Sequence, residues 1–261
     1  MLEQLPLTYP RPQQITHILF DCDNTLVLSE ELAFEACAQV ANRILEKYNI
    51  KGTHYDGPTL MKDFVGMNFR GMMVALQAKY EFKIDDDDFE KFVKAEEDQV
   101  IATLKEKAQP CINCMPQLEK LFEEKKYGLA VVSSSAYRRV KASLEKVDQD
   151  RFFPADHIFS AATSLEKPTS KPDPAIYLHA CKVIGKKPAE CVAVEDSKSG
   201  TLSAVRAGIP TIGYVGSYET PEKREEMKKV LKETGAAVIM DDWEQFPEML
   251  QSIERSASPS L

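Results

Sequence analysis

Two aspartates, Asp21 and Asp23, directly follow an apolar segment, residues 15–20, that contains neither glycine nor proline. Such a segment predicts a buried parallel strand. In open α/β sheets, ligands bind outside the carboxyl ends of the strands. Two carboxylates this close together repel each other unless a cation or a proton lies between them. The pattern indicates either a cation site or a polar turn, and these residues alone leave both interpretations open.

Further polar residues lie where other predicted strands end or shortly after. Because parallel strands end at the same edge of a sheet, we expect their side chains to gather beside the two aspartates. Hydroxyl, ammonium and carboxylate groups suit a phosphate or a metal ion. Each residue is a weak signal alone, and their convergence on one edge makes the signal strong. These residues are Ser133, Lys171, Glu195 and Asp196.

Strands and helices alternate in the second half of the chain. Alternation of this kind implies right-handed crossovers and a parallel sheet with helices on both faces. The fold class predicted is therefore α/β, with a doubly wound sheet. The predicted strands are 15–20, 127–132, 157–160, 191–194, 211–215 and 236–239. The predicted helices of this part are 117–126, 140–147, 174–184, 200–207 and 221–233.

Residues 27–108 predict a nearly all-helical insertion. Residues 49–58 contain two glycines and a proline and predict a break between helices. The acidic run 85–88 lacks the glycine and the spaced ligands of an EF-hand, so it predicts a helix N-terminus. The predicted helices are 32–48, 59–64, 69–80 and 89–108. We therefore expect two domains, a core formed by residues 1–26 and 109–261 and a helical domain formed by residues 27–108.

The composition, 43% hydrophobic and 28% charged, is that of an ordinary globular protein. The net charge of −8 disfavours a nucleic-acid surface and a basic membrane-binding stripe. No run of about 18 apolar residues predicts a membrane span. Residues 1–14 contain three prolines and no apolar core of a signal peptide, so they predict a surface arm. The serine-rich residues 252–261 predict a disordered tail.

The cysteines indicate a reducing compartment, and we expect a cytoplasmic protein. Residues 111–114 have the CxxC spacing, but no second CxxC or suitably spaced histidine pair completes a zinc site. Reduced structural thiols are therefore the favoured interpretation. The six are Cys22, Cys37, Cys111, Cys114, Cys181 and Cys191.

From residue 15 to residue 249 the sequence resembles the haloacid dehalogenase superfamily, in its branch of helical-cap sugar and polyol phosphatases and β-phosphoglucomutase-like enzymes. The motifs are Asp-Cys-Asp-Asn-Thr at 21–25, Val-Ser at 132–133, Lys-Pro-Asp-Pro at 171–174 and Val-Glu-Asp-Ser at 194–197. The resemblance implies a Rossmann-like core with a helical cap that closes over the site. It implies a phosphoric monoester hydrolase that acts on a small phosphorylated substrate and uses Mg²⁺.

The resemblance also implies a role for each motif residue. Asp21 would be the nucleophile that forms an aspartyl-phosphate, and Asp23 the general acid and base. The metal would be held by Asp21, Asp23 through its carbonyl, Asp196 and, through water or indirectly, Glu195. The phosphoryl group would contact Thr25, Ser133, Ser134 and Lys171. Candidate specificity residues are Glu30, Asn68, Arg70 and Arg138.

Two alternatives to a phosphatase stay open. Mutases that resemble β-phosphoglucomutase usually carry a histidine at the position of Ala33, which favours hydrolysis here. A non-catalytic phosphometabolite-binding module would usually have lost a motif, and all four are present. Dehalogenation is disfavoured because dehalogenases lack the second aspartate, Asp23. We expect no nucleic-acid or membrane partner, and a monomer or weak homodimer.

Overall fold

The structure is a computed structural model that describes residues 14–64 and 67–257. The chain forms two compact units: a core unit up to Val27 and from Pro110 onward, and a helical unit from Leu28 to Gln109. The predicted N-terminal arm, apart from residue 14, lies outside the described residues. Two short strands, β2 (Val27–Leu28) and β3 (Gln109–Pro110), pair with each other where the chain passes between the units.

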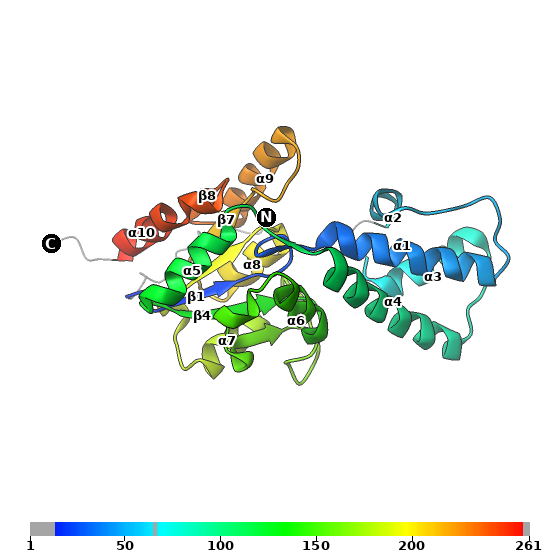
Figure 1. Cartoon of the computed structure of the whole chain (residues 1–261), viewed down its shortest axis with the longest axis horizontal. Helices are drawn as coiled ribbons and strands as arrows, with labels where there is room; N and C mark the ends of the chain where they lie inside the picture. Colours follow the sequence, from blue (N-terminus) through cyan, green and yellow to red (C-terminus); the bar gives the residue numbers. More distant parts are fainter. Residues whose placement is uncertain (1–13, 65–66, 258–261) are drawn as a thin grey trace, which may run out of the picture. The chain divides into compact units, whose positions relative to one another are not determined.

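The core unit is built on a six-stranded sheet in the order β5-β4-β1-β6-β7-β8, and every neighbouring pair is parallel. Each strand is followed by at least one helix before the next strand of the sheet, as Figure 1 shows. The predicted α/β class with a doubly wound parallel sheet is confirmed. The strands are β1 (His17–Phe20), β4 (Gly128–Ser133), β5 (Ile158–Ser160), β6 (Cys191–Glu195), β7 (Thr211–Tyr214) and β8 (Val238–Met240).

The register of the central strands brings three chain positions to one level. Phe20, the last residue of β1, lies opposite Val131 of β4 and Val194 of β6. The residues that follow these three in the chain are Asp21, Val132 and Glu195, and they also lie at one level. This register places the first aspartate between the ends of two neighbouring strands, where parallel sheets bind ligands.

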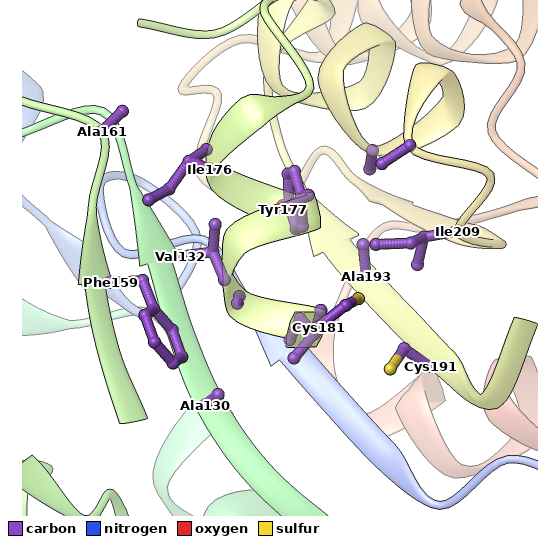
Figure 2. Packing of buried hydrophobic residues seen from close by; sticks show 14 residues of the cluster. Ala130, Val132, Phe159, Ala161, Ile176, Tyr177, Cys181, Cys191, Ala193 and Ile209 are labelled. Carbon is purple, nitrogen blue, oxygen red and sulfur yellow. The ribbon is translucent and has the colours of Figure 1, made fainter. Parts of the chain in front are cut away.

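Side chains alternate between the two faces of the sheet, and each face has its own apolar layer. On one face, Leu19 and Val132 pack with Ile176 of α7 (Ala175–Val183) and Ala204 of α8 (Lys198–Arg206), a cluster seen in Figure 2. Phe20, the neighbour of Leu19, instead has its ring near aromatic rings of a second group. This group contains Phe153, Trp243 and Phe246. The two layers fix the end of β1 firmly.

The remaining helices of the core unit follow the sheet strands or lie between them. The α-helices are α5 (Cys114–Glu124), α6 (Tyr137–Lys146), α9 (Pro221–Thr234) and α10 (Phe246–Ala257). The short 3-10 helices are Asp150–Phe152, Ala155–His157, Pro188–Glu190 and Trp243–Gln245. In the described part of the chain, no helix is long and apolar enough to cross a membrane.

The prediction of a disordered tail from residue 252 is wrong for residues 252–257, because these belong to α10. Phe246, Leu250 and Ile253 recur at the spacing of one helix face and are 1%, 4% and 3% exposed. The apolar spacing outweighs the local serine content, because burial of that face offsets the entropy of ordering the segment. Residues 258–261 lie outside the described residues.

The helical unit consists of α1 (Glu30–Lys47), α2 (Gly57–Asp63), α3 (Phe69–Tyr80) and α4 (Asp86–Lys107). Helix α1 packs against α2 and α4. Asp56, Asn68 and Asp85 cap the other three helices by accepting a backbone N–H bond. Helix α2 begins before the predicted residue 59, because Pro58 lies in its first turn, where a missing N–H costs no hydrogen bond.

Candidate active site

Three buried carboxylates lie close together at the carboxyl edge of the sheet. Asp21 follows β1, Glu195 ends β6, and Asp196 follows Glu195; they are 7%, 0% and 6% exposed. One carboxylate oxygen of each lies within 4.8 Å of the others. Like charges at this separation in a dry site are strongly unfavourable without compensating positive charge.

The Lys171 ammonium supplies part of that compensation. Its Nζ donates to Asp21 Oδ1 at 2.6 Å, to Glu195 Oε1 at 2.6 Å and to the Val132 carbonyl oxygen at 2.8 Å. The side chain of Lys171 is only 4% exposed. A buried ammonium with three good acceptors is a fixed positive charge beside the end of β1.

The pKa values of these groups reflect the balance between burial and pairing. Burial raises the pKa of the Asp21 carboxyl to about 8, although the Lys171 charge acts in the opposite direction. Burial likewise raises the pKa of Glu195, against Lys171. Burial lowers the pKa of Lys171, but the two carboxylates more than offset it and raise the pKa overall. A single lysine therefore leaves the carboxylate cluster short of positive charge.

Glu195 is held from three sides. Besides Lys171, the Tyr177 hydroxyl donates a hydrogen bond to the same oxygen, Oε1. The other oxygen, Oε2, has no hydrogen-bond partner and lies against Gly200 in the first turn of α8. A Cβ atom built on Gly200 would lie 1.8 Å from Oε2, so a larger residue there would force the carboxylate to move. Glycine at this position follows directly from the close approach of the carboxylate.

Asp23 is held by two serines at the end of β4: Ser133 is the last residue of the strand, and Ser135 lies two residues beyond it. Ser133 Oγ donates to Asp23 Oδ2 at 3.2 Å and Ser135 Oγ donates to the same oxygen at 2.8 Å. The Ser135 backbone N–H in turn donates to Ser133 Oγ at 2.9 Å. The carboxylate of Asp23 and the hydroxyl predicted to bind phosphate are therefore in direct contact.

Two further predicted residues contribute to the frame of the site. Thr25 Oγ1 donates to Asp196 Oδ1 at 3.3 Å, and the Thr25 carbonyl oxygen accepts from Trp243 Nε1 at 3.1 Å. Ser134 Oγ accepts the backbone N–H of Lys171 at 3.2 Å. Thr25 thus orients Asp196, while Ser134 fixes the backbone that carries the lysine.

These groups form one site at the edge where β1, β4 and β6 end, and comparison with known proteins identifies its family. A family model described as haloacid dehalogenase-like hydrolase matches residues 18–214, which is most of the chain. This chain belongs to that family. The matched region contains every motif residue described above, and the enzyme class predicted from the motifs is confirmed.

Several relatives of this haloacid dehalogenase-like hydrolase have a stated activity. The chain is 28% identical over 85% of its length to a phosphorylated carbohydrates phosphatase from Thermotoga maritima, of which it covers 93%. It is 25% identical over 75% of its length to the 6-phosphogluconate phosphatase of Escherichia coli, of which it covers 80%. Among solved structures, a putative β-phosphoglucomutase from Thermotoga maritima matches with a TM-score of 0.68 and 26% identity, over 91% of this chain and 99% of that one.

The hydrolase has a donor set that fits a hard divalent cation. The three clustered side chains offer only carboxylate oxygens, the ligands that Mg²⁺ and Ca²⁺ prefer. A divalent ion would also supply the positive charge that Lys171 alone does not provide. Two thiols are unsuited to this task, Cys22, which follows Asp21 in the sequence, and Cys111, which interacts electrostatically with Asp196, because burial raises the pKa of both.

The candidate specificity residues of the hydrolase lie in both units. Glu30 begins α1, and Arg138 is an exposed residue in the first turn of α6. Asn68 Oδ1 accepts the Gly71 backbone N–H as the cap of α3. Arg70 forms a bidentate pair with Glu90, an exposed residue of the same unit. The side chains of Asn68 and Arg70 are therefore already engaged within the helical unit.

Two residues of the site were not predicted from the sequence. Ser135 belongs to a run of three serines that starts with the last residue of β4, and the motifs predict a role only for the other two, Ser133 and Ser134. The run of adjacent serines was the signal in the sequence that could have indicated Ser135. Tyr177 lies within an apolar stretch of α7, so its pattern predicts only a core aromatic residue. Its hydroxyl contact depends on tertiary packing that the helix pattern does not carry.

Proposed function

We propose that this hydrolase removes phosphate from a small phosphomonoester, a phosphorylated sugar or polyol, through an aspartyl-phosphate intermediate and with Mg²⁺. The observation that carries the proposal is the contact of Lys171 Nζ with Asp21 Oδ1 at the end of β1, with Asp196 and Asp23 beside it. Phosphoryl transfer needs mainly positioning and charge neutralisation, and these groups supply both.

In the proposed reaction, an Asp21 oxygen attacks phosphorus, and the bond from phosphorus to the substrate alcohol breaks. Asp23 donates a proton to the leaving alcohol oxygen. Asp23 then takes a proton from water, whose oxygen attacks the aspartyl-phosphate. Inorganic phosphate leaves and Asp21 is regenerated. Lys171 and Ser133 bind the phosphoryl oxygens throughout.

Asp21, Asp196 and the Asp23 carbonyl would hold Mg²⁺, which would neutralise charge on the phosphoryl oxygens. Glu195 has a supporting role in this proposal. Its Oε1 already accepts from Lys171 and Tyr177, and its Oε2 lies against Gly200. Thr25 orients Asp196 through its hydroxyl.

The substrate class is supported by relatives named as phosphatases of phosphorylated carbohydrates and of 6-phosphogluconate. We propose that the helical unit acts as the cap that selects the substrate, with Glu30, Asn68 and Arg70 as candidates there and Arg138 in the core unit. Arg70 would have to exchange its pair with Glu90 for such a contact. A cytoplasmic location suits the six free cysteines.

A phosphomutase is the second candidate, favoured by the structural likeness to the putative β-phosphoglucomutase. It would use the same aspartyl-phosphate but return the phosphoryl group to a sugar phosphate. The mutase requires a sugar bisphosphate as primer, and the phosphatase does not. Alanine at position 33 favours hydrolysis.

The test is phosphate release from a panel of sugar, polyol and short organic phosphates, with Mg²⁺ or with EDTA. We expect Mg²⁺-dependent release by the wild-type enzyme and a loss of about 10³-fold or more in Asp21→Asn, because the nucleophile is removed. Isomerisation of a sugar phosphate with a bisphosphate primer and without release would favour the mutase. Phosphate binding without either reaction would favour a binding module.

A further inference from the structure

The Lys171 ammonium has no hydrogen left for a substrate. An ammonium group has three N–H donors, and here they go to Asp21 Oδ1, Glu195 Oε1 and the Val132 carbonyl oxygen. Binding of a phosphoryl oxygen by Lys171 therefore requires the exchange of one of these contacts. Which contact is exchanged determines how easily the phosphate is bound.

The three contacts differ in what their loss would leave behind. If the contact with Asp21 were given up, Asp21 would lose the ammonium that balances its buried charge. The Val132 carbonyl oxygen would lose a donor inside the protein, which is unfavourable for a buried backbone group. Glu195 Oε1 is the exception, because it would keep a second donor, the Tyr177 hydroxyl.

Tyr177 is well placed for this task. Its side chain is fully buried, and it projects from α7 into the cluster drawn in Figure 2. The centroid of its ring lies 5.3 Å from Lys171 Nζ, close enough for a cation–π contact. The ring fills the core as a phenylalanine would, whereas the hydroxyl makes a specific contact with Glu195.

From this geometry we infer that Tyr177 is a positioning residue for phosphate binding. Its hydroxyl keeps Glu195 Oε1 hydrogen-bonded while Lys171 turns one N–H from Glu195 to a phosphoryl oxygen. Tyr177 acts through Glu195 and Lys171 and does not touch the substrate. This inference rests on the proposed function for the role of Lys171 as a phosphate ligand.

The test is the affinity of the Mg²⁺-loaded protein for inorganic phosphate and for orthovanadate, measured by calorimetry. In Tyr177→Phe, the exchange leaves buried Glu195 Oε1 without a donor, so we expect dissociation constants about tenfold higher than in wild type. In turnover, we expect kcat/KM for a phosphomonoester to fall by a similar factor. Thermal unfolding of the same samples reports any loss of stability.

Two variants separate positioning from packing. Tyr214→Phe removes the hydroxyl of another fully buried tyrosine, one that contacts Cys111 and not Glu195, and should leave phosphate affinity unchanged. In a Glu195→Gln background, the added Tyr177→Phe change should alter phosphate affinity less than about twofold. Tyr177 acts through the Glu195 carboxylate, and Glu195→Gln has already removed that carboxylate.

The inference is overturned if Tyr177→Phe binds phosphate as tightly as the wild type does. It is also overturned if Tyr177→Phe and Tyr214→Phe lose the same amount of phosphate affinity. A Tyr177→Phe protein that fails to fold would assign the hydroxyl to stability and would also overturn it. If the wild-type protein binds phosphate but hydrolyses no ester, the proposed function fails, and the ratio of affinities still decides the role of Tyr177. A wild-type protein that binds no phosphate would contradict both the proposed function and the role of Tyr177.

Discussion

Two lysines, one in each unit, have nearly the same partners and very different surroundings. Lys171 pairs with Asp21 at 2.6 Å, and Lys79 pairs with Asp63 at 2.7 Å. Each ammonium also lies between 5 and 6 Å from a tyrosine ring centroid, at 5.3 Å and 5.5 Å. The side chain of Lys171 is 4% exposed, whereas that of Lys79 is 45% exposed.

The two ion pairs differ mainly in their burial. Water screens the exposed pair, and the same water would solvate either partner if the other were removed. In the core unit, Asp21 and Glu195 are buried, so solvent would compensate poorly for a lost Lys171 and these groups depend on one another. The same residue types therefore form a charge cluster suited to chemistry in one unit and a surface contact in the other.

The substitution Lys171→Met should have the largest effect, because it leaves two carboxylates buried without their cation. We expect a loss of about 3 kcal/mol in the free energy of unfolding and of about 10³-fold or more in activity. Urea unfolding and phosphate release measure the two quantities. Unchanged stability would mean that Asp21 and Glu195 are better solvated than their burial indicates.

Gly200→Ala should disturb the same cluster without changing any charge. The new methyl group would overlap Glu195 Oε2, so the carboxylate must move and take Lys171 with it. We expect a loss of about 2 kcal/mol in stability and of about 100-fold in kcat/KM. Addition of a methyl group at Gly185, where nothing lies within 4 Å, is a poor control because its φ is +69°.

A better control for Gly200→Ala is Gly71→Ala in the helical unit. Its added Cβ would lie 3.5 Å from its nearest neighbours, an ordinary contact distance, and no positive φ is involved. Activity loss in Gly200→Ala with normal stability and activity in Gly71→Ala would place the effect at Glu195. Equal behaviour of both variants would contradict the proposed contact.

Ser135→Ala should have a smaller effect that depends on the leaving group. It removes the closer of the two hydroxyl donors to Asp23, the proposed general acid. We expect about a tenfold loss in kcat for a sugar phosphate, whose alkoxide needs a proton, and little loss for p-nitrophenyl phosphate. A parallel set of initial rates measures this, and an equal loss for both substrates would rule out a role in acid catalysis.

Lys79→Met should have the smallest effect and completes the comparison with Lys171→Met. Because the pair with Asp63 is exposed, we expect the melting temperature to stay within about 2 °C of the wild-type value. Differential scanning calorimetry measures this. A shift as large as that of Lys171→Met would show that the aromatic neighbours of Lys79 are as important as burial is for Lys171.

Local sequence was sufficient to predict most of the fold and which polar residues the fold brings to one edge of the sheet. Short apolar segments predicted the strands, and polar residues at or after the ends of several of them predicted a candidate site at one edge of the sheet, because parallel strands must end together. The same kind of local signal was present for α10 and was missed, since the serines of residues 252–256 suggested disorder. The four motifs predicted the family because, in combination, they hold many residue types at fixed spacing.

Only the tertiary structure decided how the site residues contact one another. Lys171 and Asp21 are 150 residues apart in sequence, Ser135 and Asp23 are 112 apart, and Tyr177 and Glu195 are 18 apart. No local pattern encodes such hydrogen bonds, because they depend on the order and register in which β1, β4 and β6 pair. The sequence by itself determined which groups reach the edge of the sheet, and packing decided that Tyr177 and Ser135 would hold them there.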